Sequence, residues 1–313
     1  MTFVFAALIS FLIAVLVAPV AIPMLHNLKF GQEIREEGPK WHSSKSGTPT
    51  MGGVIFILAV LIAGIIFLKN SLEGVMLIYL SVAFGVIGFI DDYIKVAMKR
   101  NLGLTEIQKL IMQLVASVIF VGLLYYNGLM ETAVKIPFTT IQFEMGIWYL
   151  PFAVIVIIGC VNAVNLTDGI DGLASSVSMI VFIFFAIVLK DAPEGMFALI
   201  SAAAVLGFFL FNKYPAKVFM GDTGSLFLGG ALAGIAVCRG YALILVIAGG
   251  VYVIETLSVI LQVTYFKATG KRIFKMSPIH HHFEMCGWSE RKIVLVFSLV
   301  TTALCALAAM KLI

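Results

Sequence analysis

Charged side chains are scarce in this sequence. Asp, Glu, Lys and Arg make up 12% of its 313 residues, whereas hydrophobic residues make up 61%. Soluble globular domains carry roughly 25% charged residues, so the composition excludes an ordinary soluble domain. A membrane-spanning helix needs about 20 mainly apolar residues, and the chain contains ten such stretches. They lie approximately at 3–22, 51–68, 75–90, 110–126, 147–163, 173–189, 196–211, 223–238, 242–266 and 291–312.

These stretches predict the fold class. Because lipid offers no partner for backbone N–H and C=O groups, a spanning chain folds into helices or a closed barrel. We therefore expect an all-α polytopic membrane protein with about ten transmembrane helices, forming a single domain over residues 1–313. The ninth stretch is long for a bilayer, so a tilt or break is expected within it. The segment 131–146 alternates apolar and polar residues and predicts a short hairpin.

Cysteine motifs and an N-terminal basic region are also missing. The four cysteines form no CxxC pair, and three of them fall within apolar stretches. We therefore expect neither disulfides nor a zinc site. No Lys or Arg precedes Lys29, so the first stretch is expected to be a retained span rather than a cleaved signal peptide.

The basic residues that are present are unevenly distributed. Of the 21 Lys and Arg residues, 16 lie in the segments 23–50, 91–109, 164–172, 213–222 and 267–292. Cytoplasmic loops of membrane proteins carry such an excess, so these segments are predicted to be cytoplasmic and both termini to lie on the outer side. This asymmetry accounts for the net charge of +4, and no nucleic-acid partner is indicated.

Polar residues gather on the same predicted face. Asp91 and Asp92 close the third stretch, and Lys95 follows at helical spacing. A plain interpretation is a solvated helix end with a salt bridge. Asp168 and Asp171 follow the fifth stretch, and their plain interpretation is a capped turn before the next helix.

Asp222 directly precedes the eighth stretch, where it could also be a helix cap. Five aspartates at helix ends on one face nevertheless favour a common site. Carboxylates beside lysines and glycines suit Mg²⁺ together with phosphate oxygens, and helix N-termini with nearby glycines suit anions. The predicted site is therefore one for a metal ion and a polyphosphate.

A run of three histidines, His280, His281 and His282, lies in the last polar segment. Ser277 and Pro278 predict the N-cap and first residue of a short helix, so the histidines would lie in its first turn and could donate to a phosphate. A solvated basic loop is the alternative. Zinc binding is disfavoured, because adjacent residues cannot all face one ion.

Five motifs together carry a resemblance. The chain resembles bacterial phospho-N-acetylmuramoyl-pentapeptide transferases, within the polyprenyl-phosphate N-acetylhexosamine-1-phosphate transferases, over essentially its whole length. The motifs, in order, are GTPTMGG (47–53), DDYIK (91–95), NAVNLTDGIDGLA (162–174), NKYPAKVFMGDTGS (212–225) and SPIHHHFE (277–284).

The resemblance implies an activity and its partners. Such enzymes transfer phospho-MurNAc-pentapeptide from UDP-MurNAc-pentapeptide to undecaprenyl phosphate, which gives lipid I and UMP, with Mg²⁺ as cofactor. It also implies a multi-pass protein of the cell inner (cytoplasmic) membrane, an active site on the cytoplasmic face, contact with membrane lipid and a homodimer.

The resemblance also implies roles for individual residues. Asp222 is expected to hold Mg²⁺, while Asp91 and Asp92 face the acceptor phosphate, with Asp91 the likelier base and Lys95 neutralising the pair. His280 is expected to take part in catalysis by donating to phosphate. A further group of polar and aromatic residues is expected to bind substrate, with Phe219 stacking on uracil: Lys45, Thr50, Asn165, Asp168, Asp171, Asn212, Phe219, Gln262, His281 and His282.

Other functions stay open at this point. A sister transferase could use another UDP-N-acetylhexosamine donor, and the reaction could pass through an aspartyl-phosphate. An ion-coupled transporter would spread its acids toward the bilayer midplane, and a scaffold would need no polar clusters. Glu255, within the ninth stretch and seven residues before Gln262, is a further candidate, because carboxylates inside membranes are commonly functional.

Overall fold

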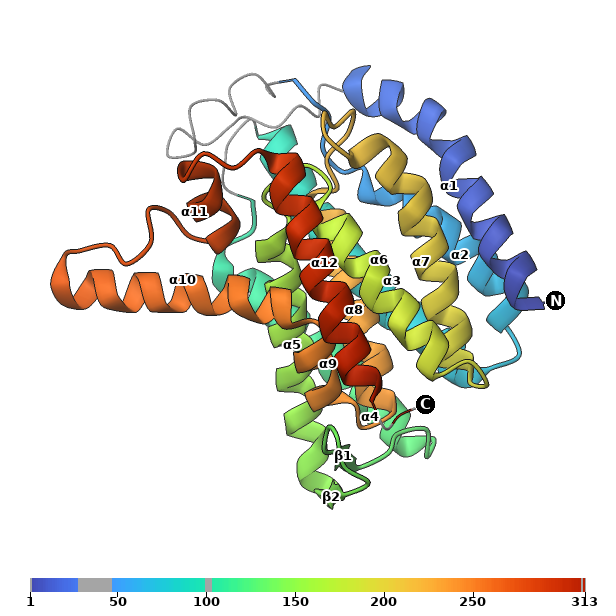
Figure 1. Cartoon of the computed structure of the whole chain (residues 1–313). Helices are drawn as coiled ribbons and strands as arrows, with labels where there is room; N and C mark the ends of the chain where they lie inside the picture. The colour runs from blue at the N-terminus through green and yellow to red at the C-terminus, as the bar shows by residue number, and fades with distance from the viewer. Residues whose placement is uncertain (1, 28–46, 99–102, 311, 313) are drawn as a thin grey trace.

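A computed structural model describes residues 2–27, 47–98, 103–310 and 312 (Figure 1). Almost all of its regular structure is helical, as the apolar stretches predict. The elements in chain order are α1 (Thr2–Asn27), α2 (Gly53–Leu68), α3 (Leu72–Ala97), α4 (Glu106–Tyr126), β1 (Ala133–Lys135), β2 (Gln142–Glu144), a 3₁₀ helix (Gly146–Trp148), α5 (Tyr149–Thr167), α6 (Leu173–Val188), α7 (Pro193–Asn212), α8 (Gly221–Cys238), α9 (Ala242–Ala248), α10 (Gly250–Thr269), α11 (Ile279–Met285) and α12 (Glu290–Ala309).

In the described part of the chain, each predicted apolar stretch corresponds to one helix, except the ninth, which corresponds to two. Eight of these helices are long and apolar enough to cross a membrane, so the chain is a multi-pass membrane protein. Helices α2 and α6 are apolar but have only 16 residues each. Whether all ten stretches span the bilayer therefore stays a prediction.

Helix α8 lies at the centre of the bundle. All residues from Thr223 to Cys238 are buried, and glycine and alanine make up much of this stretch. Small residues let neighbouring helices approach closely without a bulky side chain between them. Helices α2, α3 and α5 pack against α8, and the remaining spans surround this group. The central helix thus carries Asp222 into contact with several other elements.

The ninth stretch is broken, as its length predicted. Helix α9 ends at Ala248 and α10 begins at Gly250, after a non-helical backbone conformation at Gly249. Helix α10 projects sideways out of the bundle, and the short helix α11 lies above it (Figure 1). This bend places the histidine run beside the loops that follow α5 and α7.

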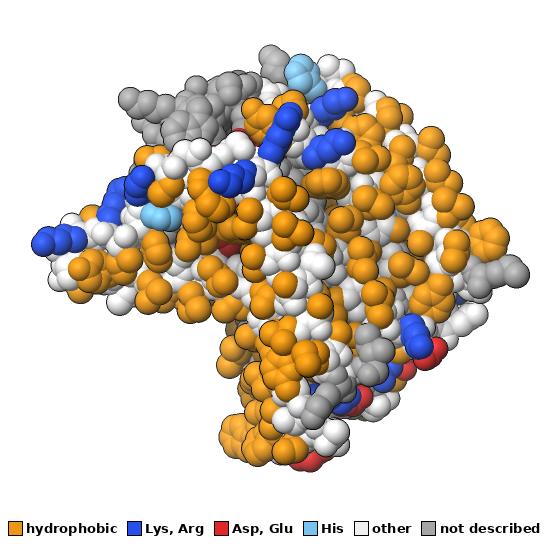
Figure 2. Space-filling view, in the orientation of Figure 1, with side chains coloured by type: hydrophobic (Ala, Val, Ile, Leu, Met, Phe, Trp, Pro, Cys, Tyr) orange, Lys and Arg blue, Asp and Glu red, His pale blue; other side chains and the backbone are white. Residues whose placement is uncertain are grey.

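The two ends of the bundle differ in their chemistry. Strands β1 and β2 pair antiparallel and confirm the predicted hairpin, with Val134 opposite Phe143. The start of α1 and the end of α12 lie toward this hairpin end (Figure 1). On the face shown in Figure 2, most Lys and Arg side chains gather at the opposite end and along α10, above a hydrophobic flank. That opposite end carries Asp222 and α11. We name it after its aspartates and call it the acidic end.

Candidate functional site

The site begins with a backbone contact between α3 and α8. A Cβ atom at Gly88 would lie 2.1 Å from the carbonyl oxygen of Asp222, a distance that no side chain tolerates. Glycine at this position therefore lets the two helices touch. The contact brings the last turns of α3 against the first turn of α8, although the segments are far apart in sequence.

Three aspartates meet at this contact. One carboxylate oxygen from each of Asp91, Asp92 and Asp222 lies within 4.8 Å of the others. Asp91 and Asp92 are 3% and 4% exposed, so their charges are offset by protein groups rather than by water. The sequence prediction that these three residues share one site is consistent with this geometry.

The local roles of the aspartates differ from the sequence interpretation. Helix α3 continues to Ala97, so Asp91 and Asp92 do not end it. Asp222 does not cap α8, because the helix begins one residue earlier. Instead, both oxygens of Asp92 accept N–H groups of α8, at 3.2 Å from Asp222 N and 2.9 Å from Thr223 N. Asp92 therefore caps α8 from a neighbouring helix, a partnership that no local pattern indicates.

Two lysines face the three carboxylates. The Nζ atom of Lys95 lies 2.5 Å from Asp91 Oδ2 and 2.9 Å from Asp222 Oδ2. The Nζ atom of Lys109 lies 2.8 Å from the same oxygen of Asp222. Asn165 Nδ2 donates to the other oxygen, Asp222 Oδ1, at 2.8 Å. Asp222 is thus the carboxylate of the cluster that contacts both lysines.

Sequence reasoning missed Lys109. It lies in the first turn of α4, after the cap Thr105, and Leu104 N donates to Asp91 Oδ1 at 2.9 Å. This hydrogen bond fixes the start of α4 next to the cluster. A single lysine at a helix start has no distinctive spacing, and its one signal was its place on the basic face.

The turn between α5 and α6 carries two further candidates. Asp171 accepts a hydrogen bond from Ala216 N at 2.9 Å and donates its own N–H to Glu290 at 3.1 Å. It therefore connects this turn to two other segments and is not a cap of α6, which begins after Gly172. Burial, followed by the nearby carboxylates of Asp222, Asp92 and Asp171, raises the pKa of Asp168 to about 8. A carboxyl group in this state can donate as well as accept hydrogen bonds.

The GTPTMGG segment lies alongside the loop before α8. Phe219 N donates to Pro49 O at 2.8 Å, and Gly52 N donates to Phe219 O at 2.8 Å. Thr50 is buried beside Gly221, and Phe219 is half-buried at the edge of the same region. That Thr50 and Phe219 bind substrate stays a prediction. Lys45 lies outside the described residues.

Two other expected substrate-binding residues hold loops. Asn212 Nδ2 donates to Val218 O at 3.0 Å, and its Oδ1 accepts from Ser175 Oγ at 2.6 Å. Gln262 Oε1 accepts two backbone N–H groups, from Ile273 and Phe274. Buried amides with these partners shape the loops around the site and leave little capacity for a ligand.

The histidine run has three different environments. Helix α11 begins at Ile279, so Pro278 is its N-cap, and the predicted Ser277 cap is wrong by one residue. His280 is fully buried. His281 Nδ1 lies 2.6 Å from Glu284 Oε2, whereas His282 Nδ1 accepts Lys275 N at 3.1 Å and so holds the preceding loop. His281 is partly exposed, with 12% of its side chain accessible.

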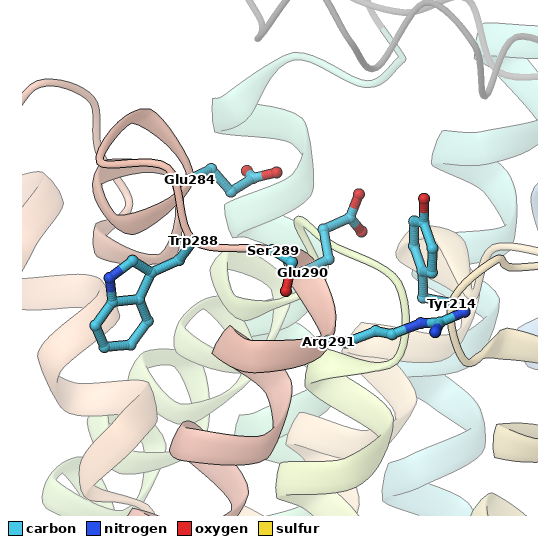
Figure 3. A pocket seen from close by; sticks show the side chains of 6 residues that line it. All are labelled: Tyr214, Glu284, Trp288, Ser289, Glu290 and Arg291. Atoms are coloured by element: carbon cyan, nitrogen blue, oxygen red, sulfur yellow. The ribbon is translucent and has the colours of Figure 1, made fainter.

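A pocket of about 580 Å³ lies next to α11 (Figure 3). The carboxylates of Glu284 and Glu290 point into the same space, with the Tyr214 ring opposite them and the Arg291 guanidinium beneath that ring (Figure 3). Arg291 Cζ is 5.1 Å from the ring centroid of Tyr214, a cation–π distance. The pocket adjoins the α5–α6 turn through the hydrogen bond between Asp171 N and Glu290.

The acidic cluster fits a divalent metal ion. Its donors are carboxylate oxygens, which Mg²⁺ prefers, and three carboxylates face only two ammonium groups among the described residues. The excess negative charge is what a cation would neutralise. No other group of three or more such ligands occurs in the described ranges.

Comparisons with known proteins identify related families. Residues 75–240 match Glycosyl transferase family 4, and residues 45–57 match the Phospho-N-acetylmuramoyl-pentapeptide-transferase signature 1. The chain is 52% identical to the Phospho-N-acetylmuramoyl-pentapeptide-transferase of Clostridium botulinum (strain Eklund 17B / Type B) over 304 residues, which cover 96% of this chain and 93% of the relative. It is 53% identical to that of Bacillus subtilis (strain 168) over 300 residues, which cover 94% and 92%.

The chain is a helical membrane bundle with an acidic site lined by lysines, and residues 75–240 match family 4. These features define a membrane-embedded glycosyl transferase. The signature and the extent of identity are more specific. The chain belongs to the phospho-N-acetylmuramoyl-pentapeptide transferase family.

Proposed function

We propose that the chain transfers phospho-MurNAc-pentapeptide from UDP-MurNAc-pentapeptide to undecaprenyl phosphate, giving lipid I and UMP. The observation that carries this proposal is the cluster of Asp91, Asp92 and Asp222 with Lys95 and Lys109 at the acidic end of a membrane bundle. A lipid acceptor accounts for a site at the edge of the membrane, and a soluble nucleotide donor accounts for its place on the charged end. The relatives' name states the transferred group, phospho-N-acetylmuramoyl-pentapeptide.

The transfer exchanges one P–O bond for another. An oxygen of the acceptor phosphate attacks the sugar-linked phosphorus of the donor, and the bond between the two donor phosphates breaks. UMP leaves with the electron pair of that bond. The acceptor phosphate, with a second pKa of about 6, is mostly dianionic at neutral pH, so a general base contributes little.

The chain's own residues supply position and charge. Lys95 and Lys109 place two ammonium groups within 2.9 Å of Asp222, where they can neutralise the donor diphosphate. Asp222 is the proposed ligand of Mg²⁺, with its second oxygen oriented by Asn165. Held there, Mg²⁺ would supply positive charge against the donor diphosphate. Asp91 is the residue proposed to face the acceptor, because both oxygens of Asp92 accept N–H groups of α8, whereas Asp91 accepts a backbone N–H only at Oδ1 and turns Oδ2 toward Lys95.

The donor's nucleotide and peptide are assigned to neighbouring surfaces. Asn165, Asp168 and Phe219 are proposed to bind the nucleotide, with Phe219 stacking on uracil. The pocket beside α11 is proposed to hold the peptide, because its carboxylates, guanidinium and aromatic rings suit a chain that carries both signs of charge. Arg291 is the group proposed to meet a peptide carboxylate.

Further parts of the proposal rest on the family resemblance. The chain is proposed to act as a single domain in the inner (cytoplasmic) membrane, with the acidic end facing the cytoplasm and both termini outside. Contact with membrane lipid follows from the exposed apolar residues of α1, such as Leu8, Leu16 and Val20. A homodimer is also proposed, and light scattering of the detergent-solubilised protein would test it.

A substrate panel tests the proposal. Purified protein is supplied with UDP-MurNAc-pentapeptide or with UDP-N-acetylhexosamines lacking the peptide, and UMP is measured with and without undecaprenyl phosphate. We expect UMP release that depends on the acceptor and is fastest with the pentapeptide donor. Faster turnover of a peptide-free hexosamine donor would identify a sister transferase instead. UMP release without acceptor would indicate the covalent two-step route.

A further inference from the structure

A buried ionisable pair lies next to the site, outside the chemistry described above. Glu255 belongs to α10 and His280 to α11, and both side chains are 0% exposed. Glu255 Oε2 lies 3.0 Å from His280 Nδ1 and 3.5 Å from the backbone nitrogen of His280. Burying a carboxylate is costly unless a partner compensates it, so this contact joins the two helices at a defined point.

The other edge of the His280 ring faces the α5–α6 turn. A Cβ atom at Gly169 would lie 2.1 Å from His280 Nε2, so the ring fills the space that glycine leaves open. Gly169 directly follows Asp168 and precedes Asp171 by two residues. The imidazole therefore stands between the carboxylate of α10 and the turn that carries Asp168, a proposed donor-binding residue.

This arrangement determines the orientation of the ring. Nδ1 faces Glu255 Oε2 at 3.0 Å, whereas Nε2 on the opposite side of the ring is directed at the turn. Carboxylates that hold one imidazole nitrogen commonly orient the other one in this way. His281, whose ring centroid is 4.1 Å from that of His280, is positioned by the same contact.

We infer that Glu255 is a positioning residue, which acts through His280 to hold the α5–α6 turn, residues 168–172, in its donor-binding conformation. The inference rests on the proposed function, in which this turn binds the UDP donor. It also gives His280 a positioning role, since the buried ring has no exposed surface to offer to phosphate.

A double-mutant cycle tests the inference. Glu255→Ala, His280→Ala and the double variant are compared for the KM of each substrate and for donor binding by calorimetry, which needs no turnover. Each single change is expected to raise the KM and Kd for the UDP donor by about ten- to hundredfold, with the KM for undecaprenyl phosphate within about twofold of wild type. Because Glu255 acts through His280, the double variant should be no worse than the worse single variant.

A steric variant provides a second test that removes no buried charge. Gly169→Ala should raise the donor KM in the wild-type background, because its methyl group displaces the His280 ring. It should have little effect in the His280→Ala background, where that space is open. If Gly169→Ala is equally harmful in both backgrounds, the ring does not mediate the effect and the inference is overturned.

Several results would separate the inference from simple loss of structure. Additive effects in the cycle, or equal increases in both KM values, would contradict it. If Glu255→Ala does not fold, Glu255→Gln with His280→Asn replaces it in the cycle, since both keep the shape of the pair. Glu194→Gln, which alters a buried glutamate at the hairpin end, is the matched control and should leave donor binding unchanged.

Absence of transfer by wild type would overturn the proposed function, whereas wild-type transfer with an additive cycle would overturn the inference alone.

Discussion

The hairpin end and the acidic end both contain buried carboxylates, but their charges are arranged differently. At the hairpin end, Glu194 is 1% exposed and accepts two hydrogen bonds from Arg239, at 3.0 and 2.9 Å. Lys135 lies 2.7 Å from Glu131, which also lies 3.8 Å from Arg239. Two carboxylates thus face two cations, and the network closes on itself.

The acidic end does not close in this way. Asp91, Asp92 and Asp222 face Lys95 and Lys109, and nearby Asp168 has a raised pKa. A surplus of buried carboxylates is unfavourable without a further cation. Carboxyl groups with shifted pKa values also cluster at functional sites. A balanced network therefore serves stability, whereas the unbalanced one is prepared for a metal ion and an anionic substrate.

The largest expected effect comes from the carboxylate at the centre of the imbalance. Asp222→Asn keeps the size of the side chain but removes its charge, so transfer should fall by about 10²–10³ or more. UMP release by the purified variant measures the loss, and its melting temperature checks the fold. Retention of a large part of wild-type activity would remove Asp222 from the metal site.

Lys109→Gln should produce two effects of opposite sign. Removing the ammonium group 2.8 Å from Asp222 weakens donor binding, and the donor KM should rise by about tenfold or more. The cluster becomes more negative, so half-maximal activity should need less Mg²⁺ than in wild type. A titration of Mg²⁺ at fixed donor concentration measures this, and an increased Mg²⁺ requirement would contradict the assigned role.

A smaller effect is expected in the pocket beside α11. Arg291→Ala should raise the KM for UDP-MurNAc-pentapeptide severalfold, because an exposed guanidinium contributes on the order of 1 kcal/mol. The KM for UDP-MurNAc without peptide should be unchanged. Equal changes with both donors would place the peptide elsewhere.

The smallest effect on transfer is expected at the hairpin end. Glu194→Gln removes one partner of the closed network, and a charge-assisted hydrogen bond contributes about 1.5–3 kcal/mol. The melting temperature should therefore fall by several degrees, while the turnover of folded protein stays at the wild-type value. Loss of turnover without loss of stability would contradict the claim that the network at the hairpin end serves stability alone.

Local patterns predicted much of the fold. Apolar length indicated the helices other than α11, the length of the ninth stretch indicated a tilt or break there, and alternation indicated the hairpin. These features depend on neighbouring residues. The predicted first residues of helices were less accurate, as at Pro278. The boundary of a helix depends on the backbone geometry of one or two residues, which the sequence pattern does not resolve.

The sequence predicted which residues belong to the candidate site but not which partners they contact. Motif resemblance named Asp91, Asp92 and Asp222, yet the capping of α8 by Asp92 depends on the contact at Gly88, which joins distant segments. The partners of Asn212 and Gln262 are backbone groups of folded loops. Such partners exist only in three dimensions, so a sequence can name the polar residue without revealing whether it binds a ligand or holds a loop.

Metal binding tests the contrast between the two ends most directly. Mn²⁺, which can substitute for Mg²⁺ and is visible by electron paramagnetic resonance, is titrated into wild type, Asp222→Asn and Glu194→Gln in the presence of the UDP donor. The charge imbalance predicts one tightly bound Mn²⁺ per chain in wild type and Glu194→Gln, and none in Asp222→Asn. Equal binding by all three proteins would contradict the assignment of the metal site to the acidic end.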